Sequence, residues 1–176
     1  LDANPAMSEH DYRIINKAIQ KFAKTYSQGR PDTNYFRQMF WCFTHTLKNS
    51  GMRPKELLNA RFKDVTITNK PRWSWDTESE ENKYYASIWV RKSKTGKQRD
   101  AICRSNAGDR LVAFRQYQKD WFARYRPGFT LTDEMLLFGK PSENMLKTVS
   151  HRHMCNTWRD IVNSVLPKLK GNRFSE

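Results

Sequence analysis

The chain has 176 residues, 38% of them hydrophobic and 13% aromatic, which is long and apolar enough to fold around a core. Its 32 Lys and Arg against 18 Asp and Glu give a formal net charge of +14, which indicates a polyanionic partner, nucleic acid ahead of an anionic membrane surface. The sequence has no apolar run near the roughly 20 residues of a membrane span and no secretory pattern at its start, and three scattered cysteines argue against a disulfide framework. We therefore expect a cytoplasmic protein with no membrane partner.

The first third of the chain is predicted to be helical. Ser8 is placed to cap a helix, and apolar residues then recur at helical spacing, at Tyr12, Ile15, Ile19, Phe22 and Tyr26. A second helix fits residues 34–49, with Gly51 just past its end. Pro54 suits the first turn of a third helix that runs to about Ala60.

The middle of the chain carries β patterns. The alternating run DVTIT, residues 64–68, predicts a short strand. The polar segment 69–83 is expected to be an irregular insertion. Residues 84–104 then predict two strands joined by a turn at 94–97, where Gly96 supplies the positive φ of a tight hairpin.

The last third returns to helical periodicity. One helix is expected from Ser105 or Asn106 to about Tyr125, and another from His151 to Leu169, with a short apolar run between them. The sequence contains no internal repeat. It therefore predicts an α+β fold over residues 1–176, a mostly helical single domain with a small antiparallel sheet or hairpin.

Arg53 stands between two predicted helices, directly before Pro54. A helix start presents unpaired N–H groups and partial positive charge, and a guanidinium adds a planar fork that fits two phosphate oxygens. Arg53 is thus a candidate phosphate clamp. The structural alternative, favoured by position alone, is that Arg53 pairs with Glu56 or caps the preceding helix.

The predicted hairpin carries a second group of basic residues. Lys94 and Lys97 lie at its turn, where an ammonium group can protonate a leaving oxygen; the alternative is a solvated basic turn. The basic residues predicted here to contact the backbone of duplex DNA are Arg91, Lys92, Lys97, Arg99 and Arg104.

In combination these elements resemble the catalytic domain of tyrosine recombinases, the phage-integrase family. The resemblance rests on SGMRPKELLNARFKDV, on the following strand and hairpin with SKTGK, and on a later LLFGK. In the family the first segment has the form T-G-x-R-x-x-E-L-x-x-L-x-W-x-D-I. The residues that match it are Gly51, Arg53, Glu56, Leu57, Asp64 and, conservatively, Val65, whereas Ser50, Ala60 and Phe62 replace its Thr, Leu and Trp.

The resemblance implies roles for four residues. Arg53 would be the first catalytic arginine, which holds the scissile phosphate, and Lys94 the acid for the 5′-hydroxyl leaving group. Glu56 and Asp64 would be structural carboxylates. One would orient the side of the site that carries the catalytic arginine, and the other would cap the turn into the strand. The intact protein would be a site-specific integrase of a phage or mobile element, located at the bacterial nucleoid. It would act on double-stranded DNA as a homo-tetramer through a 3′-phosphotyrosyl link, with no metal or other cofactor.

The family also uses a His-x-x-Arg box and a late tyrosine nucleophile. His151 and His153 do not provide the box, because Met154 and Asn156 stand at the third position after them. No tyrosine follows Tyr125. We therefore expect a partial catalytic domain, a DNA-binding fragment without the nucleophile; the alternative is a noncatalytic DNA-binding module that shares the fold.

Two groups of residues have side chains of the types that can bind a metal ion. The cysteines and histidines match no common zinc spacing, so we expect Cys42, Cys103 and Cys155 to be small buried residues. The acidic run of residues 76–81 suits either Mg²⁺ in a nuclease or a solvated loop, and we favour the loop.

Trp73 and Trp75 lie beside Arg72 within the expected insertion. Such a group can stack on nucleic-acid bases. We favour the alternative that the two indoles pack the insertion onto the domain.

Overall fold

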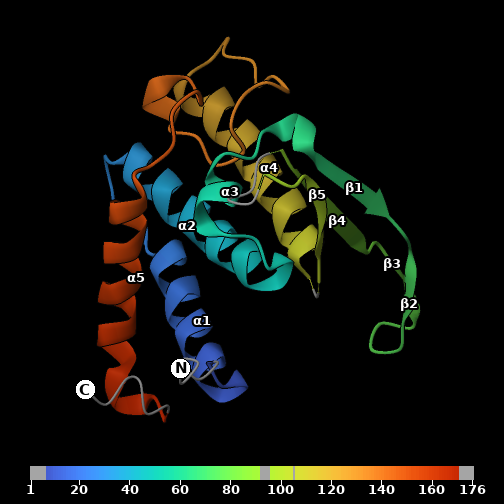
Figure 1. Cartoon of the computed structure of the whole chain (residues 1–176), viewed down its shortest axis with the longest axis vertical. Coiled ribbons are helices and arrows are strands. Elements are labelled where there is room, and N and C mark those ends of the chain that lie inside the picture. The colour runs from blue at the N-terminus through green and yellow to red at the C-terminus, as the bar shows by residue number, and fades with distance from the viewer. Residues whose placement is uncertain (1–6, 92–95, 105, 171–176) are drawn as a thin grey trace.

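The computed structural model describes residues 7–91, 96–104 and 106–170. Within these residues the chain forms five α-helices, a three-stranded antiparallel sheet and a separate two-stranded ribbon (Figure 1). The sheet lies on one side of the molecule and α1 and α5 on the other, with α2 and α4 between them (Figure 1). The predicted α+β class with mostly helical mass is confirmed.

Helix α1 (Glu9–Lys24) begins as the sequence predicts. The Ser8 hydroxyl accepts a hydrogen bond from the Asp11 backbone N–H at 3.0 Å, and Ile15 and Ile19 are buried. The helix ends before Tyr26, however, because Thr25 is extended, and the Tyr26 side chain is 66% exposed. Tyr26 therefore does not continue the apolar face assigned to it.

Helix α2 (Pro31–Ser50) is the central element of the core. It packs between α1 and α4, and its inward side chains include Tyr35, Met39 and Phe40, each 1% exposed. Gly51 ends it with φ of +63°, a left-handed conformation that glycine adopts without strain. This turn leads directly into the short helix α3 (Pro54–Leu58), whose Leu57 and Leu58 are buried.

The three-stranded sheet has the order β1–β4–β5. Its strands are β1 (Val65–Asn69), β4 (Tyr84–Val90) and β5 (Arg99–Cys103), and the 3₁₀ turn η1 (Phe62–Asp64) leads into β1. The register pairs Val65 with Ile88 and Val90 with Arg99. Arg99 and the residue after Val90 therefore lie at the same end of the sheet as η1.

Helix α4 (Ala107–Tyr125) covers the inner face of this sheet. The side chains of Ala86 and Ile88 point inward from β4 and are buried. Gly108 allows the close approach, since a Cβ at this position would lie 2.2 Å from the carbonyl oxygen of Tyr84.

The segment 69–83 is not irregular, as the sequence suggested, but forms a ribbon. Strands β2 (Arg72–Ser74) and β3 (Ser79–Glu81) pair antiparallel and project beyond the ends of β1 and β4 (Figure 1). Trp73 is 48% and Trp75 85% exposed, and their rings contact each other edge to face at 6.2 Å. The indoles thus do not pack the segment onto the domain, because the two strands pair with each other away from its core.

Helix α5 (His151–Val165) lies beside α1 on the side opposite the sheet (Figure 1). Ser150 caps it by accepting from the His153 N–H at 3.2 Å. It stops before the predicted end at Leu169 because Pro167 cannot continue an α-helix, and a 3₁₀ turn, Leu166–Lys168, follows. Among the described residues, no helix is long and apolar enough to cross a membrane.

Candidate functional site

Arg53 occupies the N-cap position of α3, directly after the left-handed turn at Gly51. Its side chain is 54% exposed, and one guanidinium nitrogen lies 3.6 Å from a carboxylate oxygen of Glu56. The structure thus contains the ion pair given above as the structural alternative for Arg53. Because more than half of the side chain faces solvent, it remains accessible to an external anion.

Glu56 joins Arg53 to the hairpin strand β5. Its side chain is only 5% exposed, and its Oε2 accepts one hydrogen bond from the Arg53 backbone N–H at 2.9 Å and another from the Arg99 guanidinium at 2.8 Å. The first bond satisfies a free N–H group at the start of α3. The second fixes a residue 43 positions later in the chain. One buried carboxylate therefore holds two arginines from separate elements side by side.

Asp64 makes the equivalent connection for the other hairpin strand. Its side chain is 3% exposed, with Oδ2 accepting from the Arg61 N–H at 2.9 Å and Oδ1 from the Arg91 Nε at 2.6 Å. Arg91 follows the last residue of β4, and Arg99 is the first residue of β5. The two ends of the predicted hairpin are thus each tied to the segment 53–64 by a buried carboxylate.

The other predicted site residues are distributed unevenly. Lys97 is exposed two residues before Arg99, at the same end of the sheet. Arg104 follows the opposite end of β5, where its backbone N–H donates to the Asn49 carbonyl at 2.8 Å, so it is not part of this group. Lys92 and Lys94 lie outside the described residues. The group brought together is therefore Arg53, Arg91, Lys97 and Arg99, which we call the basic cluster.

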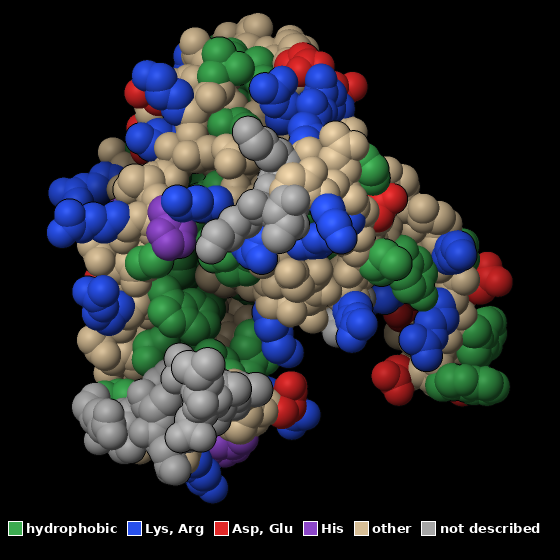
Figure 2. Space-filling model, in the orientation of Figure 1, with side chains coloured by type: hydrophobic (Ala, Val, Ile, Leu, Met, Phe, Trp, Pro, Cys, Tyr) green, Lys and Arg blue, Asp and Glu red, His purple; other side chains and the backbone are tan. Residues whose placement is uncertain are grey.

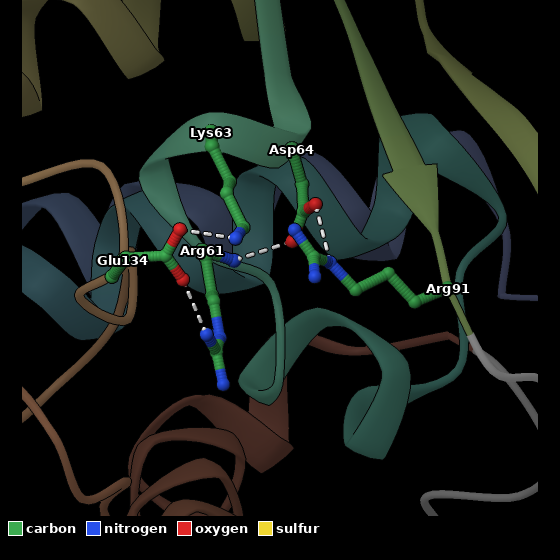
Figure 3. A network of polar contacts seen from close by, with 5 residues as sticks. All are labelled: Arg61, Lys63, Asp64, Arg91 and Glu134. Atoms are coloured by element: carbon green, nitrogen blue, oxygen red, sulfur yellow. Dashed lines mark hydrogen bonds and ion pairs between the residues drawn. The ribbon is translucent and has the colours of Figure 1, made fainter.

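A second group of polar side chains, not predicted from the sequence, adjoins the basic cluster through Asp64 (Figure 3). Glu134, from the loop after α4, accepts from the Arg61 guanidinium at 2.6 Å and from the Lys63 ammonium group. The pKa of the Glu134 carboxyl is lowered, first by the hydrogen bond from Lys63 and then by that from Arg61. In the orientation of Figure 1, Figure 2 shows several separate groups of Lys and Arg side chains on the viewed face of the molecule.

The histidines at the start of α5 have local contacts. The His153 ring packs on Phe36 at 4.6 Å between centroids, and His151 lies 3.6 Å from the Cys155 sulfur. The His-x-x-Arg spacing does occur at His10 and Arg13, but on α1 and ahead of Arg53 in the chain, the reverse of the order in recombinases.

The three cysteines are free thiols in different surroundings. Cys42 and Cys103 are buried, as expected, and burial raises the pKa of Cys42 to about 12 and that of Cys103 to about 11. Cys155 is exposed, so the expectation of burial is wrong for this residue. Its neighbour His151 is one turn away on the same helix, and α5 turns this side chain away from the core.

Metal-binding residue types do not converge in the described part of the chain. The carboxylates of residues 76–81 lie on the exposed ribbon, and no group of three His, Cys, Asp or Glu side chains among residues 7–91, 96–104 and 106–170 could hold a metal ion.

A groove of about 1210 Å³ lies between α1, α2 and α5, away from the basic cluster. Its lining includes the apolar side chains of Phe22 and Phe36 and the cations Lys17 and Lys21. None of the four residues of the basic cluster lines this groove.

Comparisons of this chain with models of protein families, with curated proteins and with solved structures give no match.

Proposed function

We propose that this chain binds the backbone of duplex DNA through the basic cluster, and that it is the phosphate-holding part of a tyrosine-recombinase catalytic domain. The observation that carries the proposal is the contact of Glu56 with both Arg53 and Arg99. It joins two of the stretches on which the recombinase resemblance rests, the segment around Arg53 and the hairpin strand that carries Arg99. A chance resemblance of two stretches would not require them to meet in space.

The electrostatics of the basic cluster support a phosphate ligand. Each arginine in it keeps a large exposed fraction, 54% for Arg53, 44% for Arg91 and 40% for Arg99, although two buried carboxylates fix their positions. Guanidinium groups held in place lose less rotational freedom when they bind a phosphate. The net charge of +14 adds long-range attraction to a polyanion.

The reaction proposed for the intact recombinase is strand exchange through a covalent intermediate. A tyrosine oxygen would attack a backbone phosphorus, forming the 3′-phosphotyrosyl bond as the 5′-oxygen leaves with a proton. Arg53 would stabilise the negative charge of the phosphorane. The assignment of Lys94 as the proton donor to the 5′-oxygen stays a prediction from the sequence.

The test compares two charge-matched double variants in duplex DNA binding at one salt concentration. Arg53→Gln with Lys97→Gln removes two positive charges from the basic cluster. Lys17→Gln with Lys21→Gln removes two from exposed lysines of α1 that line the groove between α1, α2 and α5, away from the basic cluster. If each lost phosphate contact costs about 1 kcal/mol, the first variant binds roughly 30-fold more weakly than the wild type, and the second nearly as well.

Fluorescence anisotropy with a labelled duplex gives the dissociation constants. Far-UV circular dichroism checks that both variants are folded. Equal losses of affinity in the two variants would mean that DNA binding depends only on the net charge of the protein. No loss of affinity in the first variant would mean that Arg53 and Lys97 do not contact DNA.

A further inference from the structure

Arg61, Lys63 and Glu134 form a compact ionic group on the surface beside the basic cluster (Figure 3). The two oxygens of Glu134 are divided between the two cations, Oε2 accepting from Arg61 at 2.6 Å and Oε1 from Lys63. The carboxylate side chain is 60% exposed, whereas Arg61 and Lys63 are 42% and 33% exposed. A guanidinium and an ammonium group thus form a fork that already holds two oxygens of one anion.

The carboxylate of Glu134 is not needed to join the two segments that carry these residues. Their backbones are linked by three hydrogen bonds: Phe62 N–H to the Met135 carbonyl at 3.1 Å, Lys63 N–H to that of Asp133 at 3.0 Å, and Leu137 N–H to that of Ala60 at 2.9 Å. Exposed ion pairs contribute little to stability, typically below about 1 kcal/mol. The fork can therefore exchange its anion while the backbone around it stays in place.

The fork is joined to the basic cluster through Asp64. The Arg61 backbone N–H donates to Asp64, which also holds the Arg91 guanidinium (Figure 3). A duplex backbone presents successive phosphates along each strand, so a ligand bound at Arg91 has further phosphates available to nearby cations.

We propose that Arg61 and Lys63 form a second phosphate-binding subsite for duplex DNA, and that the Glu134 carboxylate occupies it until a backbone phosphate displaces it. This inference rests on the proposed function, because it needs the chain to bind DNA. A glutamate is ionised at neutral pH, and the hydrogen bonds from Lys63 and Arg61 lower the pKa of Glu134 further, so the charged carboxylate competes with phosphate for the fork.

Glu134→Gln tests the subsite directly, with Glu143→Gln as the matched control. Glu143 is also an exposed glutamate, 42% exposed, and pairs at 3.3 Å with Lys147, four residues later in the chain. Each substitution removes one negative charge. Glu134→Gln removes a competing carboxylate that is held by two exposed ion pairs, so this variant is expected to bind duplex DNA about threefold to tenfold more tightly than the wild type. Glu143→Gln is expected to change the affinity by less than about twofold.

A third variant shows where the gain arises. In the Glu134→Gln background, Arg61→Gln with Lys63→Gln should abolish the gain and lower the salt slope of binding by about 0.9 for each lost contact. Equal affinities of Glu134→Gln and Glu143→Gln, or a gain that survives loss of both cations, would overturn the subsite. If the wild type binds no duplex at all, it is the proposed function that fails. Thermal unfolding of each variant confirms that the fold is intact.

Discussion

Raising the salt concentration from about 50 to 200 mM is expected to weaken duplex DNA binding by at least about 150-fold. This magnitude follows if the four residues of the basic cluster each contact one phosphate, since each contact contributes about −0.9 to the slope of log affinity against log salt. The arginines of the cluster are each 40% or more exposed, so its contacts with a phosphate backbone would be mainly ionic and sensitive to salt.

The measurement is anisotropy of a labelled duplex over a potassium chloride series. Circular dichroism at both ends of the series controls for salt effects on the fold. A loss of less than about fivefold would contradict backbone contact by the basic cluster, because even two phosphate contacts should exceed it.

Glu56→Ala is expected to lower the free energy of unfolding by about 2–3 kcal/mol and to weaken DNA binding, although it removes a negative charge. The Glu56 side chain is 5% exposed and accepts from the Arg53 N–H and the Arg99 guanidinium. Its loss leaves a free N–H at the start of α3 and a cation without its buried partner. Because Arg53 and Arg99 are partly exposed, the loss in free energy of unfolding stays below that for breaking a fully buried ion pair.

Glu56→Gln is the control, since an amide oxygen can still accept from Arg53. It should lose less stability, about 1 kcal/mol, and retain more DNA affinity. Urea unfolding followed by circular dichroism gives the stabilities, and binding is measured where each variant remains folded. Tighter DNA binding by Glu56→Ala would show that this carboxylate only repels DNA and does not position the arginines.

The helices and the main sheet could be predicted because their signals are local. Ser8 as a cap, Gly51 as a helix end and the positive φ of Gly96 each act through nearby backbone, whereas the rest of the predicted turn at 94–97 lies partly outside the described residues. Errors arose where tertiary packing decides the outcome. Trp73 and Trp75 looked like packing residues, but their ribbon has no core beneath it, and Cys155 lies on the outer side of α5.

The site could be predicted only in part, for a related reason. Arg53 and Glu56 lie one helical turn apart, so their pairing was an open alternative from the sequence. The partners Arg99 and Arg91 lie 43 and 27 residues from the carboxylates that hold them, and only the register of β4 and β5 brings them near. Glu134 reaches Lys63 over 71 residues through a loop with no periodic pattern, so no sequence signal could indicate it.

The most direct measurement is the salt slope of duplex binding for the wild type and for Arg53→Ala. If the exposed guanidinium of Arg53 holds a backbone phosphate, the slope should become shallower by about 0.9 and the affinity should fall at every salt concentration. If the plots of log affinity against log salt coincide for the two proteins, Arg53 makes no phosphate contact. That result would also contradict the assignment of this surface to recombinase chemistry.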